Sequence, residues 1–313
     1  MNRFTTPRVI DVHQHLWPAS LVEELRARDT PPRLRAWTLE LDGEPDQGVD
    51  PRHHDPRARR QEAAADGIDV VLVSLPGALG IELLPPRECR ALLEAYHEGV
   101  LSLPEPFGAW AAACLTDIQP EELRRELARG FAGLGLPASA LCDEEGYIRL
   151  RPLLEVLEEF GRPLFIHPGP AVVAPTAPSW WPSIVSHVGQ MHAAWYAFRA
   201  FGRPRHPTLR VCFAMLAGLA PLHGERFLAR TGLRTVVDEN VFLDVSSYGT
   251  RAIDATVRVL GIDVLVAGSD RPYASPAVPD LGAAAVSAIR GANPLRLLHR
   301  KEVFDVLAIA SGT

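Results

Sequence analysis

The sequence predicts an α/β protein whose fold is a single (β/α)8 TIM barrel, with residues 1–313 as one domain. Three observations lead to this fold class. Eight short apolar runs alternate with longer amphipathic stretches, as expected when strands alternate with helices. The runs are almost continuously hydrophobic, which is typical of parallel strands buried on both faces. The length of 313 residues fits eight strand-helix units in one barrel.

The apolar runs define the predicted strands, which are rich in Val, Ile, Leu and Phe. In chain order they are Val9–Leu16, Val70–Leu75, Ala109–Leu115, Phe131–Leu136, Leu164–His167, Arg210–Met215, Val241–Ser246 and Val264–Gly268. A dinucleotide-binding doubly wound sheet would need a GxGxxG turn after an early strand, and the sequence has none. The alternation therefore favours a closed barrel.

Amphipathic stretches between these runs define the predicted helices, several of which begin near a proline or end before a glycine. They are Arg57–Asp66, Pro86–Gly99, Gln119–Arg129, Leu150–Phe160, Ser183–Phe201, Leu219–Thr231, Arg251–Leu260 and Pro294–Leu307. Helices of a barrel form its outer ring. We therefore expect histidines within them, such as His187 and His192, to face solvent or neighbouring helices.

Two predicted loops are longer than a barrel needs. One extends from Trp17 to Pro56 after the first strand, with a short helix expected at Ala19–Arg28, and the other extends from Pro168 to Pro182 after the fifth. Both leave the carboxyl ends of their strands, where barrel active sites are built. We expect both loops to shape the pocket.

Composition excludes several classes of function. The net charge is -6, so no strongly basic surface indicates nucleic acid or an anionic membrane as a partner. No apolar stretch reaches about 18 residues, so no membrane span is expected. The chain begins without an apolar leader, and its four cysteines lie far apart without a CxxC motif. A cytoplasmic protein that binds a small-molecule substrate is expected, and the oligomeric state stays open, with a homodimer suggested only by analogy.

Histidines and one carboxylate lie at the ends of three predicted strands. His13 and His15 are two residues apart on one strand, so both side chains point to the same face and can chelate one divalent ion. His167 ends the fifth strand, and Asp270 follows the eighth. Each residue alone is also compatible with a hydrogen-bonded turn or cap. Together they predict a metal site on the catalytic rim of the barrel.

These segments resemble the amidohydrolase superfamily, specifically the amidohydrolase-related branch typified by aminocarboxymuconate semialdehyde decarboxylase. The resemblance spans nearly the whole chain and rests on residues 11–15 (DVHQH), 66–69 (DGID), 164–169 (LFIHPG), 214–221 (AMLAGLAP) and 268–272 (GSDRP). It implies one metal held by His13, His15, His167 and Asp270. Zinc is the expected metal, and manganese, iron or cobalt would also fit three histidines and a carboxylate.

The chain departs from the family pattern at one position. The sixth-strand motif of the family contains a proton-shuttling histidine, and the matching residue here is Met215. A thioether cannot act as an acid or a base at neutral pH. His223 lies eight residues farther along, at the start of the next predicted helix, and could substitute for it if it reaches the rim, but a surface or helix-end position is the favoured interpretation.

Three functions remain open. We predict first a hydrolase of an amide, ester or lactone bond, with Asp270 as the general base for a metal-activated water. The alternative is a non-oxidative decarboxylase of an aromatic or muconate-type acid, in which an acid protonates the ring carbon. The third is a metal-binding barrel that has lost catalysis, which only Met215 favours.

Substrate contacts are expected from residues near the predicted ligands. Arg271 and Arg52 carry guanidinium groups that suit a substrate carboxylate, and both are also compatible with surface ion pairs. Trp17 and Trp180 could form aromatic walls for a flat substrate, or could be packing anchors. Further candidates that line the mouth are Trp181, Tyr248 and Tyr273.

Overall fold

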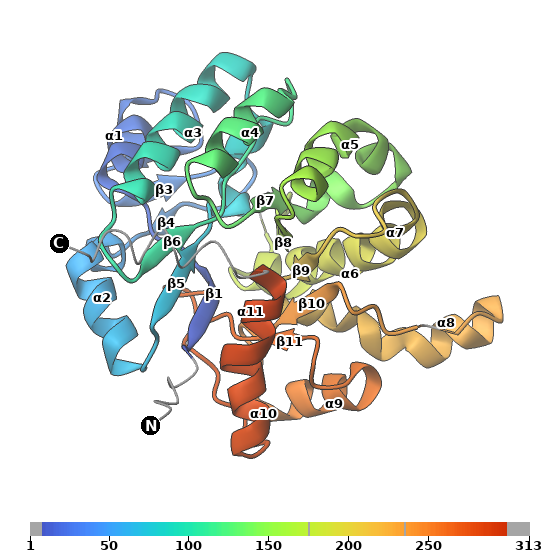
Figure 1. Cartoon of the computed structure of the whole chain (residues 1–313). Helices are drawn as coiled ribbons and strands as arrows, with labels where there is room; N and C mark the ends of the chain where they lie inside the picture. The colour runs from blue at the N-terminus through green and yellow to red at the C-terminus, as the bar shows by residue number, and fades with distance from the viewer. Residues whose placement is uncertain (1–7, 175, 235, 299–313) are drawn as a thin grey trace.

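The computed structural model describes residues 8–174, 176–234 and 236–298, and it has an α/β fold (Figure 1). Eight parallel strands lie in two sheets. One sheet has the order β1-β5-β6, and the other has the order β11-β10-β9-β8-β7. The strands are β1 (Ile10–Gln14), β5 (Val70–Val73), β6 (Phe107–Ala109), β7 (Leu134–Pro137), β8 (Leu164–His167), β9 (Val211–Phe213), β10 (Val241–Asp244) and β11 (Leu265–Val266).

Isolated parallel bridges lie between the edges of the two sheets. One bridge pairs Ala111, just beyond β6, with Leu134 in β7, and the other pairs Gln14 in β1 with Arg271, beyond β11. Close to the second bridge, the backbone N–H of Val12 donates to the carbonyl oxygen of Ala267 at 2.9 Å. Consecutive strands are therefore neighbours, and the first strand also contacts the segment that follows the last.

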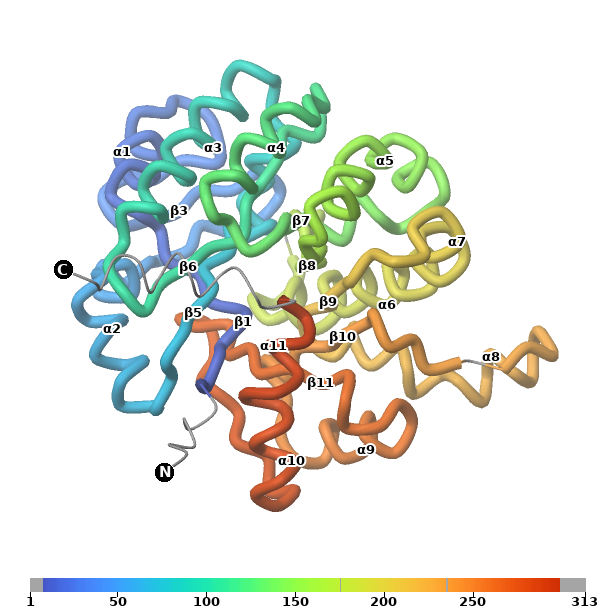
Figure 2. Tube along the Cα trace, in the orientation of Figure 1, coloured from blue at the N-terminus to red at the C-terminus, as the bar shows by residue number. Residues whose placement is uncertain are grey.

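Helices lie around the strands in both views (Figures 1 and 2). The α-helices are α1 (Ala19–Ala27), α2 (Pro56–Ala65), α3 (Pro86–Leu101), α4 (Pro120–Ala128), α5 (Glu144–Glu159), α6 (His187–Ala197), α7 (Arg203–Arg205), α8 (Gly224–Thr231), α9 (Thr250–Leu260), α10 (Ala283–Ser287) and α11 (Asn293–Leu298). The strands are buried almost completely, which explains why their sequences are continuously apolar.

All eight predicted strands overlap observed strands, but the boundaries differ. The largest difference is at the predicted strand Ala109–Leu115, because β6 is residues Phe107–Ala109 and the rest is irregular apart from the isolated bridge at Ala111. Helix α5 begins at Glu144 rather than at the predicted Leu150, since the carboxylate of Asp143 accepts a hydrogen bond from the N–H of Gly146 and caps an earlier start. The part of the predicted helix Pro294–Leu307 beyond residue 298 lies outside the described residues.

The long loop after β1 contains more structure than predicted. The expected short helix is present as α1, and it is followed by a small antiparallel sheet of β2 (Arg33–Arg35), β3 (Thr38–Glu40) and β4 (Gln47–Gly48). These strands are too short and too polar to give a recognisable alternating pattern. All four cysteines are unpaired. Within the described ranges, no helix has both the length and the apolarity required to cross a bilayer.

Candidate metal centre and active-site pocket

Four side chains converge at the carboxyl ends of the strands. His13 lies in β1, His15 follows that strand, His167 ends β8 and Asp270 follows β11. Nε2 of His15 lies 3.1 Å from Nε2 of His13 and 3.2 Å from Nε2 of His167. Oδ1 of Asp270 lies 3.1 Å from Nε2 of His15. The structure thus brings together the four residues that the sequence singled out, with their ligand atoms all within 4.8 Å of one another.

The three histidines present the same ring nitrogen to the cluster. Their Nδ1 atoms contact oxygens at 2.7–3.0 Å, which belong to the carboxylate of Asp244 for His13, the carbonyl of Ser74 for His15 and the carbonyl of Pro168 for His167. Such oxygens only accept hydrogen bonds, so in the neutral rings Nδ1 carries the proton and Nε2 keeps a free lone pair. Three lone pairs therefore face one another.

This donor set fits a divalent cation. Burial, together with the charges of His15 and His13, holds the pKa of His167 well below its ordinary value, so this ring presents a free lone pair to the cluster. Oδ1 of Asp270 is buried and has no hydrogen-bond partner among the described residues. Three imidazole nitrogens and one carboxylate oxygen are a common ligand set for zinc and related metals.

Asp244 supports the cluster through its contact with His13, and the sequence analysis did not predict this role. Its Oδ2 contacts Nδ1 of His13 at 2.7 Å, and its Oδ1 accepts hydrogen bonds from the backbone N–H groups of Met215 and Ser246 at 3.0 and 2.9 Å. The carboxylate is fully buried, and a Cβ on Gly268 would lie only 2.8 Å from it. An ionisable residue in the buried run of β10 is the signal that could have revealed it.

A second network orients the backbone of the ligand loops. Oδ1 of Asp11 accepts hydrogen bonds from the N–H of His13 at 3.1 Å and of Ser269 at 3.0 Å. The N–H of Asp270 donates to the carbonyl of His13 at 2.9 Å, and Asp270 adopts a left-handed conformation with φ of 59°. Aspartate tolerates this region better than most residues. The first strand and the segment after β11 are therefore locked together at the site.

A pocket of about 640 Å³ opens above the cluster. Its walls come in part from both long loops, as predicted, because residues between 39 and 47 of the first loop and Pro168, Ser179 and Pro182 of the second contribute to it. Leu39, Leu41 and Leu79 form part of an apolar wall, and Tyr248 and Tyr273 line the pocket as expected from the sequence. The pocket is suited to a small, partly apolar ligand held beside the four-residue cluster.

Four residues expected to contact the substrate (Arg271, Arg52, Trp17 and Trp180) do not line this pocket, and neither does His223. The guanidinium of Arg271 pairs with Asp66 at 2.6 Å and with Glu62, and Arg52 pairs with Asp50 at the surface. These arginines are held by nearby carboxylates. The other three are Trp17, which is buried and stacks on His54; Trp180, whose side chain is 53% exposed; and His223, whose ring packs against His192.

His187 corrects the expectation that helix histidines face outward. It lies at the start of α6 and lines the pocket together with His167 and Asp270. Its Nε2 is buried and has no hydrogen-bond partner in the described part of the chain. A π-helical turn at Pro182–Ser186 precedes it and shifts the side-chain phase relative to a regular helix. Periodicity at 3.6 residues per turn therefore could not place this residue.

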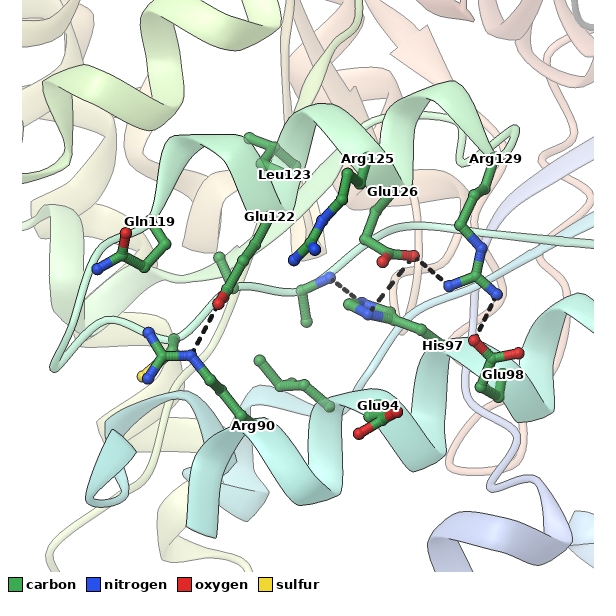
Figure 3. Close-up of a pocket in the computed structure, with 14 residues that line it drawn as sticks. Arg90, Glu94, His97, Glu98, Gln119, Glu122, Leu123, Arg125, Glu126 and Arg129 are labelled. Atoms are coloured by element: carbon green, nitrogen blue, oxygen red, sulfur yellow. Dashed lines mark hydrogen bonds and ion pairs between the residues drawn. The ribbon is translucent and has the colours of Figure 1, made fainter. Parts of the chain in front are cut away.

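A second pocket lies between α3 and α4, and several of its charged groups pair with one another (Figure 3). Arg129, which caps α4, pairs across the groove with Glu98 of α3 at 2.6 Å and, within its own helix, with Glu126 at 2.9 Å. His97 accepts a hydrogen bond at Nε2 from the N–H of Ala112, and burial with nearby Arg129 lowers its pKa to about 3. These side chains stabilise the packing of two helices and do not indicate a catalytic centre.

Comparisons with known sequences find matches that cover most of the chain. A family model described as amidohydrolase matches residues 10–300. A curated relative, 2-amino-3-carboxymuconate-6-semialdehyde decarboxylase from Dictyostelium discoideum, is 27% identical over 259 residues, which cover 74% of this chain and 71% of that protein.

Two solved structures are also similar to the chain. IDCase from Metarhizium anisopliae gives a TM-score of 0.75 at 20% identity, covering 95% of this chain and 98% of that one. A 5-carboxyvanillate decarboxylase from Novosphingobium aromaticivorans, with bound manganese and 3-methoxy-4-hydroxy-5-nitrobenzoic acid, gives 0.69 at 16% identity, covering 96% and 99%. At these sequence identities, the similarity to the two solved structures shows a shared fold and nothing about activity.

Proposed function

The chain belongs to the amidohydrolase family, and from that premise we propose that it is a metal-dependent carboxy-lyase, which releases CO₂ non-oxidatively from a small aromatic or muconate-type acid. The observation that carries the proposal is the relative named as a carboxymuconate semialdehyde decarboxylase, which covers 74% of the chain. The sequence alone ranked hydrolysis first because Met215 replaces a proton-shuttling histidine. The comparisons favour the decarboxylase instead.

We propose that His13, His15, His167 and Asp270 hold one divalent metal ion. The inward lone pairs of the histidines and the unpartnered Oδ1 of Asp270 support this assignment. When bound, the ion would supply positive charge that binds and orients the carboxylate and a neighbouring oxygen of the substrate. Zinc remains the expected metal, and the manganese of the similar 5-carboxyvanillate decarboxylase makes manganese the second candidate.

The chain's own residues prepare the pocket for loss of CO₂. Leu39, Leu41 and Leu79 contribute apolar side chains to the lining of the pocket. A substrate carboxylate that enters such a space loses part of its hydration, whereas the CO₂ that it becomes carries no charge. The apolar environment therefore favours breakage of the bond between the carboxylate carbon and the ring. The reaction also needs one proton at the carbon that the carboxylate leaves.

We infer, further, that the two sheets close into the predicted (β/α)8 barrel in one domain. The parallel bridges from β6 to β7 and from β1 to the segment after β11 support this closure. In a closed barrel all strand ends lie on one rim, which accounts for residues so far apart in sequence meeting at one site.

The proposed function is tested by CO₂ release from the metal-loaded protein. A panel of hydroxybenzoates, methoxyhydroxybenzoates and a muconate-type acid is offered in parallel with lactones and aryl esters, after reconstitution with zinc or manganese. We expect CO₂ and the corresponding decarboxylated product from at least one acid, and loss of that activity after chelation. Acid release from lactones or esters without any CO₂ would instead establish the hydrolase.

A further inference from the structure

His187 is an uncommitted imidazole in the active-site pocket. Of the histidines that line this pocket in the described ranges, His15 and His167 use Nε2 in the cluster and Nδ1 in a hydrogen bond to a carbonyl. His187 differs, because its Nε2 is out of contact with solvent and has no hydrogen-bond partner there. Leaving such a buried nitrogen unpaired costs stability. This cost is typical of a group that finds its partner in a bound ligand.

Three other ionisable groups that line the pocket, Glu44, Tyr248 and Tyr273, are less suited to proton transfer. The carboxylate of Glu44 already accepts a hydrogen bond from the side chain of Gln47 at 3.3 Å. Burial raises the pKa of both Tyr248 and Tyr273, so these phenols release a proton even less readily than usual. Imidazole is the side chain whose proton affinity best matches acid-base work near neutral pH. His187 is therefore the strongest candidate proton donor.

The position of His187 is that of a neighbour of the metal cluster and not of a fifth ligand. It stands outside the group of ligand atoms that lie within 4.8 Å of one another. It interacts electrostatically with Asp270 and with His167, yet it forms no ion pair with Asp270. A substrate carboxylate directed at the cluster would thus place its attached carbon toward this side of the pocket.

We propose that Nε2 of His187 delivers the proton to the substrate carbon that loses CO₂. This inference rests on the proposed decarboxylase function. Sequence analysis offered His223 as the substitute for the missing sixth-strand histidine, but His223 does not line the pocket. Met215 does line it, and its thioether has no proton to give.

The proposed step balances in atoms and charge. The protonated imidazole of His187 transfers its Nε2 proton to the carbon that bears the carboxylate. The bond from that carbon to the carboxylate then breaks, its electron pair returns to the ring, and neutral CO₂ leaves. His187 is left neutral and regains a proton from water, so the net reaction consumes one proton and requires no oxidant or reductant.

The arriving substrate helps to charge the imidazole. In the free pocket, burial lowers the pKa of His187, and the Asp270 carboxylate opposes this effect. A substrate carboxylate brings a further negative charge into the same poorly solvated space, which favours the imidazolium. The imidazolium of His187 would therefore form when the substrate is bound beside it.

The test compares His187→Gln with His192→Gln in the metal-loaded enzyme. His192 is a matched control, because it lies on the same helix but packs against Tyr196 and His223 outside the pocket. We expect H187Q to keep the metal content of the wild type and to lose about 10²–10⁴-fold in kcat for CO₂ release. The H192Q variant should stay within about threefold of the wild type, because surface substitutions away from the site have small effects.

A second measurement detects the proton transfer itself. The decarboxylated product is incubated with enzyme in D₂O, and exchange of its ring hydrogen is followed by mass spectrometry. We expect exchange with the wild type, no detectable exchange with H187Q, and partial recovery of CO₂ release when imidazole is added to His187→Ala.

Each outcome is decisive. Exchange and CO₂ release by H187Q at the wild-type rate would overturn the role of His187 while leaving the decarboxylase intact. Loss of metal from H187Q would make His187 a ligand and would also overturn it. Lactone or ester hydrolysis by the wild type without CO₂ release would overturn both proposals together.

Discussion

Two pockets of this molecule each contain histidine and charged side chains, yet they differ in how those groups are satisfied. Between α3 and α4, Arg129 bridges two glutamates and His97 accepts a backbone N–H, so the groups neutralise one another (Figure 3). At the strand ends, the ring nitrogens of three histidines face one another, and Asp270 and His187 keep buried atoms that have no hydrogen-bond partner in the described part of the chain. Unsatisfied groups cost stability and are retained where they bind something.

The largest effect should come from the cluster itself. We expect Asp270→Asn to lower kcat/KM for CO₂ release on the order of 10³-fold or more, because the charge of a metal ligand is lost and several kcal/mol of charge stabilisation depend on the ion. Steady-state kinetics of the reconstituted variant measure this. A variant with near wild-type activity and one bound metal would remove Asp270 from the ligand set.

Asp244 offers a smaller effect of a different kind. It does not enter the cluster but fixes the proton on Nδ1 of His13 and thereby the direction of Nε2. We expect Asp244→Asn to weaken metal affinity by about 10–100-fold, with activity recovered at saturating metal. Titration with a competing chelator gives the affinity. If activity stayed low at saturating metal, Asp244 would have a further role in catalysis.

The groove between α3 and α4 should respond in stability and not in turnover. The folded pKa of His97 is lowered to about 3 by burial and by Arg129, so its contribution is present above the unfolded pKa of about 6.5 and is lost as pH falls below it. We expect His97→Gln to make the free energy of unfolding less dependent on pH between about 6.5 and 4, by up to about 1.4 kcal/mol per pH unit.

Denaturant unfolding at several pH values measures that slope, and CO₂ release at pH 7 should stay within about threefold of the wild type. A large loss of turnover in the folded variant would contradict the contrast between the two pockets.

The smallest effect is expected at the mouth of the pocket. Glu44 is half-buried there and, when ionised, its carboxylate repels an incoming anion. We expect Glu44→Gln to lower KM for a carboxylate substrate by roughly two- to fivefold at low salt, with the difference shrinking as salt screens the charge. An unchanged KM at low salt would show that Glu44 lies off the entry path.

Sequence reasoning succeeded where a local pattern determines the position. The two-residue spacing of His13 and His15 on a strand places both side chains on one face, and apolar runs locate the strand ends that carry His167 and Asp270. These relations depend on backbone periodicity alone. The family motifs then linked segments that lie more than 250 residues apart.

Sequence reasoning failed where tertiary packing determines the direction of a side chain. Arg271 directly follows the ligand Asp270 in the sequence. Its guanidinium nevertheless pairs with Asp66, 205 residues earlier in the chain, and so does not point into the pocket. His187 enters the pocket because a π-helical turn precedes it, and no helical periodicity predicts that turn. The small sheet β2-β3-β4 was missed because its strands are short and polar.

The most direct test of the account is the metal content of the purified, reconstituted protein, measured by inductively coupled plasma mass spectrometry beside Asp270→Ala. The account predicts about one equivalent of zinc or manganese per chain in the wild type and a marked loss in the variant, because the binding free energy of such sites depends on every ligand. A wild-type protein that binds no metal after reconstitution, or a variant that keeps it fully, would contradict the four-ligand site and the decarboxylase that depends on it.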